Sequence, residues 1–191
     1  MIENCGLDET VTFSNTAVNS LEPNSSILGA RAGDTLSVRD CLYALLLQSA
    51  NEVANALAEH CAGSIDAFAE KMNEKAAELG CMDTYFITPN GLDKEDENGF
   101  HGTTAADLAR IMSYCINESP VKETFLEITQ TPSYSFSNIE GTRNYSCNNH
   151  NRFLTMMDGA ISGKTGFTGN AGYCYVGALR RDDRTYVVAL L

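Results

Sequence analysis

The chain has 191 residues, 43% of them apolar, which is enough to bury one hydrophobic core, and we expect a single domain over residues 1–191. The net charge of -12, with only 13 scattered Lys and Arg, excludes a nucleic-acid-binding surface, because phosphate contacts need clustered basic residues. No apolar run approaches the roughly 18 residues that span a bilayer, and the N-terminal residues lack the basic start and apolar stretch of a signal peptide.

The first part of the chain predicts short extended segments followed by a helix. Residues 10 to 38 contain "TVTFS" and "SSILGARAGDTLSV", joined by Asn, Ser and Pro turns. The apolar period then becomes helical, and Ser37 and Asp40 have the spacing of a capping box before "CLYALLLQ".

Two more helices are expected in the middle of the chain. One runs from Ser64 through "IDAFAEKMNEKAAEL" and ends at Gly80, a residue type typical of helix C-termini. Another follows Thr104, which again has capping-box spacing to Asp107. The stretch between them, "TPNGLDKEDENGFHG", predicts a long polar loop.

After residue 130 the apolar period is two, which indicates strands. "SYSFSN" and "RNYSC" flank Glu140 and Gly141 and predict a hairpin. Three further strands are expected around "SGKTGFT", "AGYCYVGALR" and "RTYVVALL", the last two joined by a tight turn at Arg181 to Asp183. A helical region followed by an antiparallel sheet predicts an α+β domain.

Ser49 is a hydroxyl residue in an apolar row, since Leu45 and Val53 lie on the same helical face. A lone serine there would be expected to bond to the carbonyl four residues earlier. Polar side chains gather around it, however, at Gln48, Asn51 and Asn55, and they favour a break in the helix that faces a cleft.

Lys164 lies in "GKTG", which at first suggests a phosphate-binding loop. The spacing rejects that interpretation because Asp158 stands where the loop needs its first glycine, and a strand follows where a helix is required. A lysine beside glycine on a strand favours a peptide carboxylate, because the glycine admits a backbone and the ammonium supplies charge. The alternative is a solvated lysine that protects a sheet edge from aggregation.

Metal and cofactor sites are not expected from the spacing of cysteines and histidines. Seven cysteines without a Cys-x-x-Cys pair are expected to be mostly small buried apolar residues. His60, His101 and His150 lack metal-ligand spacing and are expected at the surface or at helix ends.

Ser-x-Asn at residues 49 to 51, followed far downstream by Lys-Thr-Gly at 164 to 166, resembles two motifs of the penicillin-recognising serine enzymes. Together with "TPNGLD", "HGTTAADLARI", "NHNRFL" and "GKTGFTGNAGYCYVGALRR", the chain from about residue 8 onward resembles the D-alanyl-D-alanine carboxypeptidases of the low-molecular-weight penicillin-binding protein family (peptidase S11). The resemblance implies the penicillin-binding-protein and β-lactamase-like fold.

The resemblance also implies roles for residues of both motifs. Ser49 relays protons near the nucleophile, and Asn51 orients the catalytic lysine and bonds the substrate amide. Lys164 and Thr165 bind the terminal carboxylate of the substrate. The other two residues that it implies are Gly166, which leaves room for the substrate backbone, and Phe167, whose amide is an oxyanion-hole donor. This chemistry needs no metal or other cofactor.

The nucleophile motif Ser-x-x-Lys of the family is missing upstream of Ser49. Its only match is Ser119 to Lys122, where the proline and the helix end predict a loop and therefore a coincidence. We therefore expect a partial catalytic domain, truncated at both ends, without the N-terminal strands, the nucleophile helix and the C-terminal helix of the family. The apolar strand at residues 184 to 191 would then have an exposed edge that favours self-association, and the chain alone would be marginally stable and inactive.

The function that the resemblance implies is a serine-type D-Ala-D-Ala carboxypeptidase, which removes the terminal D-alanine of peptidoglycan stem peptides through an acyl-enzyme and is inhibited by β-lactams. The alternative is a non-catalytic protein that binds peptidoglycan peptides or a partner; a β-lactamase is less favoured. The family works outside the cytoplasmic membrane, so we expect the parent protein in the cell envelope, although this chain carries no signal peptide or anchor.

Overall fold

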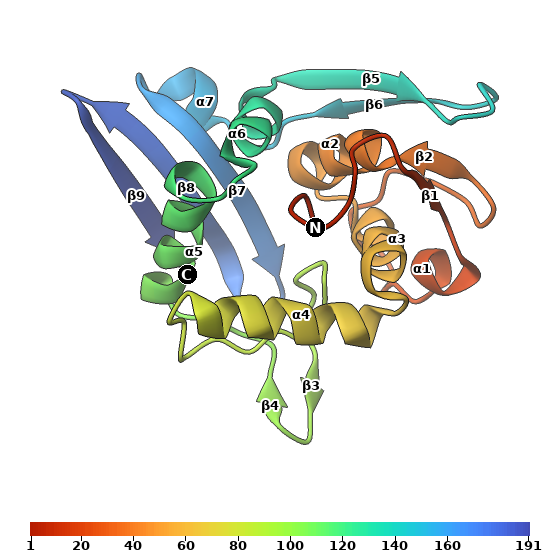
Figure 1. The fold of residues 1–191 in the computed structure, drawn as a ribbon, viewed down its shortest axis with the longest axis horizontal. Helices are drawn as coiled ribbons and strands as arrows, with labels where there is room; N and C mark the ends of the chain where they lie inside the picture. Colours follow the sequence, from red (N-terminus) through yellow and green to blue (C-terminus); the bar gives the residue numbers. More distant parts are fainter.

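A three-stranded antiparallel sheet stands beside a group of helices in the computed structural model, which describes residues 1–191 (Figure 1). The helices are Asn15–Asn19 (α1), Val38–Gln48 (α2), Asn51–Ala62 (α3), Ile65–Glu78 (α4), Ala105–Asn117 (α5), Lys122–Gln130 (α6) and Phe153–Met156 (α7). The strands are Thr10–Thr12 (β1), Thr35–Ser37 (β2), Glu95–Asp96 (β3), Gly99–Phe100 (β4), Ser133–Ser137 (β5), Asn144–Asn148 (β6), Ala160–Thr168 (β7), Gly172–Arg181 (β8) and Arg184–Leu190 (β9). The α+β prediction is confirmed.

The helix starts expected at Ser37, Ser64 and Thr104 are confirmed, the first and the last of which have capping-box spacing. Each cap oxygen accepts a hydrogen bond from the backbone N–H three residues on, at 3.0 Å for Ser37, 3.1 Å for Ser64 and 3.1 Å for Thr104. Such a bond satisfies one of the free amides of the first turn and stabilises a helix by about 1 kcal/mol. Each cap bond joins residues only three positions apart, so these helix starts can be predicted from the sequence alone.

The helices α1, α6 and α7 were not expected. The extended prediction for residues 10 to 38 is right for β1 and β2 and wrong for α1, where the Ser14 hydroxyl caps the helix and Ala17 is fully buried. Helix α6 has no side-chain cap. It is stabilised instead by Ile128 and Thr129, which are buried in the fold. Tertiary packing therefore decides α6, whereas α1 also has a local cap at Ser14.

The sheet has the order β7-β8-β9, and Lys164 lies opposite Val176 on β8. The predicted tight turn between β8 and β9 is confirmed: Asp182 and Asp183 have φ angles of 50° and 57°, as a two-residue hairpin turn requires. The β5-β6 hairpin is also confirmed. Figure 1 shows α5 and α6 beside the sheet, where Met112 and Ile116 of α5 pack against β8.

The main hydrophobic core lies around α2 and α3. It buries Leu47 of α2 and Val53 and Leu57 of α3 completely, together with residues of β1, β2 and the β5-β6 hairpin. Each such side chain contributes roughly 1.5–3 kcal/mol relative to exposure. The two helices that flank Ser49 are therefore held rigidly on both sides of it.

One loop histidine departs from its expected place. His101 is partly buried, and its Nδ1 accepts the backbone N–H groups of Ile87 at 2.9 Å and Thr88 at 3.2 Å. Burial lowers the pKa of His101. It therefore organises the polar loop before α5 as a neutral acceptor, instead of lying at the surface or at a helix end.

The outer edge of β9 has no neighbouring strand, as expected, and carries exposed Tyr186, Val188 and Leu190.

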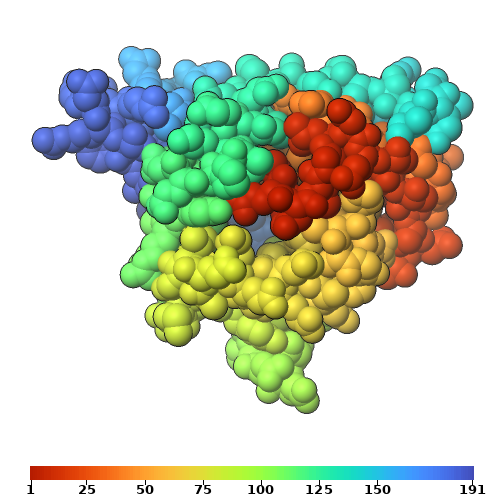
Figure 2. Space-filling model, in the orientation of Figure 1, coloured from red at the N-terminus to blue at the C-terminus, as the bar shows by residue number.

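On the face seen in Figure 2, the N-terminal residues lie between α6 and α4 with a hollow beside them. Apolar side chains, Ile2, Leu46 and Ile111 among them, line this pocket of about 280 Å³. No helix of the structure has the length and apolar character needed to cross a membrane.

Candidate active site

Ser49 occupies the break between α2 and α3. It has φ 58° and ψ 43°, the left-handed conformation, which is uncommon for a residue with a side chain and costs about 1 kcal/mol or more. The predicted break is confirmed, and it turns the Ser49 hydroxyl toward β7 instead of back to the carbonyl of Leu45. Only its backbone N–H bonds there, at 3.1 Å. Strained serines of this kind are characteristic of functional sites.

The segment at Ser26 and Ile27 holds the break together. The carbonyl of Ser26 accepts from Asn51 twice, from the backbone N–H at 2.9 Å and from Nδ2 at 3.1 Å. The Ser26 hydroxyl donates to the carbonyl of Gln48 at 2.8 Å, and Gln48 Nε2 donates to the carbonyl of Ile27 at 2.9 Å. Most of the polar cluster around Ser49 therefore satisfies the open helix ends.

Lys164 reaches from β7 to the helix break. Its Nζ donates to Ser49 Oγ and, at 2.6 Å, to the carbonyl of Thr165. Burial lowers the pKa of Lys164 from its ordinary 10.5 to about 8. The alternative of a solvated edge lysine is wrong: β7 is an edge strand of the sheet, but this side chain is partly buried and points to Ser49.

The residues after Lys164 line the free edge of β7. Thr165 is partly buried, whereas Gly166 and Phe167 are exposed, and the Phe167 ring packs against Tyr173 with 4.8 Å between centroids. Strand β7 pairs only with β8. Its other edge can therefore accept an extended peptide.

The structure thus brings Lys164 to Ser49 and leaves Asn51 without a direct bond to either. Asn51 Nδ2 is engaged with Ser26, whereas its Oδ1 accepts no hydrogen bond. The side chain is buried at 8% exposure.

Two residues of the loop before α7, His150 and Asn151, belong to the surroundings of the site but were not expected there. The N–H of His150 donates to the carbonyl of Leu47 at 3.0 Å, and burial together with the charge of Lys164 lowers the pKa of His150. Asn151 Nδ2 is buried without a partner. Both residues lie in "NHNRFL", one of the segments that resemble the family, but nothing in that segment alone indicates that it lies near Lys164.

Gly163 explains why a glycine precedes Lys164. A Cβ at this position would lie 2.5 Å from the Tyr175 hydroxyl and 2.6 Å from Asn151 Nδ2, and neither distance is sterically allowed. The loop and strand β8 therefore approach the backbone closely only because the side chain is absent.

The polar loop before α5 contacts the end of β7. Thr168 Oγ1, at the end of β7, donates to Asp93 Oδ1 at 2.9 Å, and Asn90 Nδ2 donates to Asn55 Oδ1 at 3.3 Å. A polar pocket of about 610 Å³ lies here. Asn55 of the sequence cluster therefore faces this pocket.

The single Ser-x-x-Lys match lies outside this site. Ser119 is in the turn between α5 and α6, as expected, and its hydroxyl donates to Glu3 Oε1 at 2.6 Å. Lys122 is the first residue of α6 and donates to the carbonyl of Asn117 at 3.1 Å. Both groups are thus bound in local structure.

Comparisons with known proteins agree on one family. The family model of the D-alanyl-D-alanine carboxypeptidases, peptidase S11, matches residues 3–191. The D-alanyl-D-alanine carboxypeptidase DacB2 of Mycobacterium tuberculosis is 37% identical over 91% of this chain and 57% of its own length. DacF of Bacillus subtilis is 30% identical over 88% of this chain and 41% of its own length. The chain therefore spans about half the length of these curated relatives.

Solved structures extend the likeness to the fold. A crystal structure of a D-alanyl-D-alanine carboxypeptidase from M. tuberculosis matches with a TM-score of 0.85 at 34% identity, covering 99% of this chain and 67% of that one. The Streptomyces K15 DD-transpeptidase matches with a TM-score of 0.83 at 29% identity, covering 97% and 72%. The fold is that of the penicillin-binding-protein-like DD-peptidases, and the chain belongs to the D-alanyl-D-alanine carboxypeptidase family, peptidase S11.

Proposed function

We propose that these residues form the carboxylate-binding part of a serine-type D-Ala-D-Ala carboxypeptidase, which removes the terminal D-alanine of peptidoglycan stem peptides through an acyl-enzyme. The observation that carries the proposal is the bond from Lys164 Nζ to Ser49 Oγ. It joins the two motifs directly, on a fold shared with DD-peptidases.

The substrate binds as an extended peptide along the free edge of β7. The Lys164 ammonium and the Thr165 hydroxyl hold its terminal carboxylate, since a cation and a neutral donor together satisfy both carboxylate oxygens. Gly166 keeps the edge open for the substrate backbone. The backbone N–H of Phe167 donates to the oxyanion that forms at the penultimate carbonyl.

Ser49 and Lys164 also move protons. With a pKa of about 8, Lys164 exchanges its proton near neutral pH, and Ser49 relays it to the nitrogen of the leaving D-alanine. The free Oδ1 of Asn51 accepts from the lysine of the nucleophile motif. These roles need no metal or other cofactor.

The nucleophile comes from a Ser-x-x-Lys segment outside residues 1–191, in the same polypeptide or another. Its serine oxygen bonds to the penultimate carbonyl carbon, the peptide nitrogen leaves with a proton, and water then hydrolyses the ester. The apolar pocket beside Ile2, Leu46 and Ile111 supports this proposal, because a helix packed there would cover it.

Labelling with a fluorescent penicillin tests the proposal. We expect no covalent adduct on residues 1–191 and a lasting adduct on a polypeptide that also contains a Ser-x-x-Lys segment, with loss of that adduct in the Lys164→Met variant. An adduct on residues 1–191 alone would overturn the assignment of the nucleophile. Rapid penicillin turnover in the longer polypeptide would favour a β-lactamase.

A non-catalytic protein that keeps the carboxylate-binding strand and binds peptidoglycan peptides or a partner is the second candidate. It predicts binding of D-Ala-D-Ala peptides without release of D-alanine in any form of the protein. Because the S11 family consists of cell-wall peptidases, we propose that the complete protein lies in the cell envelope. We also propose that β-lactams inhibit the complete enzyme. Self-association through the outer edge of β9 is part of the same proposal.

A further inference from the structure

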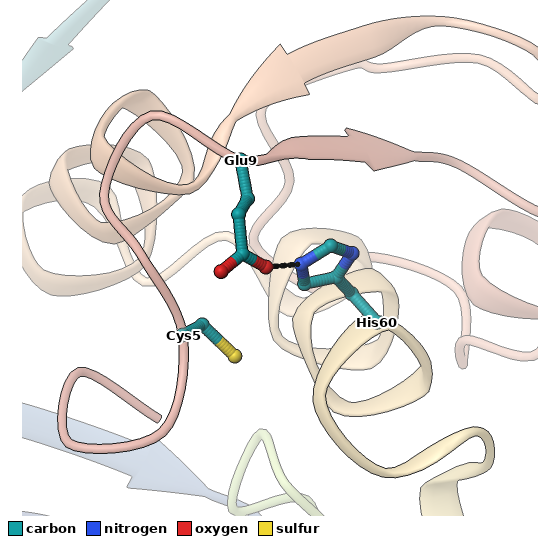
Figure 3. A group of neighbouring side chains, drawn as sticks. All are labelled: Cys5, Glu9 and His60. Atoms are coloured by element: carbon teal, nitrogen blue, oxygen red, sulfur yellow. Dashed lines mark hydrogen bonds and ion pairs between the residues drawn. The ribbon is translucent and has the colours of Figure 1, made fainter.

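Three potential metal ligands that are far apart in the sequence meet at the end of α3 (Figure 3). The ligand atoms of Cys5, Glu9 and His60 all lie within 4.8 Å of one another. The expectation that the histidines and cysteines form no metal-like cluster rested on spacing along the chain. The fold nevertheless brings these three side chains together, because it places the N-terminal loop beside the last turn of α3. The helix-end position of His60 itself is confirmed.

The loop that carries Cys5 and Glu9 is held in place by backbone bonds. Val38 N donates to the carbonyl of Glu9 at 2.9 Å, and Arg39 N donates to the carbonyl of Leu7 at 2.9 Å, so the loop is fixed to the start of α2. Helix α3 fixes the other side. The three ligands therefore come from two anchored elements, which reduces the entropy that a bound ion must overcome.

The carboxylate of Glu9 is oriented by two separate partners. Its Oε1 accepts the backbone N–H of Gly6 at 2.6 Å, and its Oε2 lies 2.8 Å from His60 Nε2. A Cβ on Gly6 would lie 3.0 Å from Oε1, so the glycine permits this close approach. An outer donor that fixes one carboxylate oxygen and leaves the other for an ion is a common feature of metal sites.

A second thiol, that of Cys61, lies next to Cys5. Burial, the Cys61 thiol and the Glu9 carboxylate together raise the pKa of Cys5 to about 11, so Cys5 is a neutral thiol in the metal-free chain and must release its proton when an ion binds. All seven cysteines are free, and Cys5 and Cys61 are both partly buried. The group thus offers sulfur, nitrogen and oxygen donors with a further thiol at its border.

A simple ion pair between His60 and Glu9 is the plainer explanation of part of this cluster. Their side chains are 21% and 52% exposed, and such pairs contribute only about 0–1 kcal/mol. That explanation leaves the Cys5 thiol, which packs against the main core and donates to Met1 Sδ at 3.8 Å, unconnected with the ion pair beside it. A metal ion accounts for all three groups.

We propose that Cys5, Glu9 and His60 bind a zinc-class divalent ion, with the fourth position open to water. Thiolate, imidazole and carboxylate together select zinc over magnesium or calcium, which prefer oxygen ligands alone. With metal–ligand distances of about 2.0–2.3 Å, tetrahedral ligand atoms lie about 3.4 Å apart, so the cluster closes by small side-chain movements.

The ion would tie the N-terminal loop to α3, the helix that begins at Asn51. Cys5 and Glu9 lie outside the Lys164 cleft, so the ion takes no part in peptide cleavage. Its effect is on stability, because a ligand that binds only the folded chain raises the free energy of unfolding.

Cobalt(II) is the probe of choice, since it replaces zinc and reports thiolate ligation by a charge-transfer band. The reduced, metal-free chain of 191 residues is titrated with cobalt(II), and zinc is then added to displace it. We expect a thiolate-to-cobalt band that zinc removes. Both Cys5→Ser and His60→Gln should weaken cobalt binding at least about 100-fold, because even outer partners of metal ligands are worth about 10- to 100-fold.

Cys174→Ser is the matched control, because Cys174 is a partly buried free cysteine on β8 and should leave cobalt binding unchanged. Circular dichroism of each variant identifies loss of folding. If Cys5→Ser does not fold, Glu9→Gln replaces it, with weakened binding again expected. No thiolate band with the folded wild-type chain, or unchanged affinity in a folded Cys5→Ser or Glu9→Gln variant, would overturn the site.

Discussion

Replacing Lys164 with methionine should stabilise the fold while removing the carboxylate-binding charge. The pKa of this lysine is 10.5 in an unfolded chain and about 8 in the fold, and a pKa difference of one corresponds to about 1.4 kcal/mol. Keeping Lys164 charged below pH 8 therefore costs about 3 kcal/mol of folding free energy. Loss of its bonds to Ser49 and Thr165 offsets about 1 kcal/mol, which leaves a net gain of about 2 kcal/mol.

The gain should depend on pH in a defined direction. Between pH 8 and 10.5 the unfolded chain keeps the proton of Lys164 and the folded chain has released it, so the stability of the wild type rises with pH. The methionine variant lacks this rise. Its advantage should be full at pH 7 and should shrink to nothing or reverse by pH 10.5.

Urea denaturation of both proteins at pH 7 and at pH 10, followed by circular dichroism, measures the two differences. At pH 7 the variant should also melt about 4–8 °C higher, since 1 kcal/mol corresponds to about 2–4 °C in a domain of this size. A variant that is less stable than the wild type at pH 7, or an equal difference at both pH values, would refute the account of Lys164 as a charge held in a desolvated cleft.

Four further predictions concern packing, the buried polar groups and the sheet edge. Gly163→Ala should cost about 1–3 kcal/mol in thermal unfolding, because its Cβ would lie 2.5 Å from the Tyr175 hydroxyl; an unchanged melting temperature would contradict this close approach. Asp107→Ala should lower the free energy of unfolding, measured by urea denaturation, by about 3 kcal/mol, since this buried carboxylate accepts from Asp83 N and Thr84 Oγ1. A decrease below about 1 kcal/mol would show that water can take the place of the carboxylate. The lowered pKa of His101 means that its contribution to stability is present above pH 6.5 and is lost as the pH falls below it. His101→Gln should therefore lose less stability than the wild type between pH 7.5 and 5.5 in parallel melts, and an equal loss would argue against a neutral acceptor. Val188→Lys should reduce self-association in sedimentation velocity by charging the outer edge of β9, whereas an unchanged distribution of species would exclude that edge.

Local signals in the sequence predicted most of the fold. The caps at Ser37, Ser64 and Thr104 are bonds between residues three apart, so they are visible without knowledge of the tertiary structure. Helix α6 has no such bond and forms because Ile128 fits the core, which no local pattern shows. Alternating apolar residues predicted the strands, but not that β7 would lie at the edge of its sheet.

The candidate site was predicted in part by chemistry and in part by resemblance. A polar cluster at Ser49 indicated the helix break, whereas only the resemblance to the family connected it with Lys164 on a distant strand. His150 was missed because a single histidine has no spacing to interpret. The group of Cys5, Glu9 and His60 could not be predicted for the same reason, since its members meet only when the N-terminal loop packs on α3.

Peptide binding by isothermal titration calorimetry tests the carboxylate clamp most directly. The probe is N-acetylated L-Lys-D-Ala-D-Ala, compared with the same peptide carrying a C-terminal amide. We predict that the free carboxylate binds at least about 10-fold more tightly, because charge-assisted hydrogen bonds contribute about 1.5–3 kcal/mol, and that Lys164→Met removes this preference. Equal affinity of the wild type for both peptides would contradict the assignment of Lys164 and Thr165 as the carboxylate site.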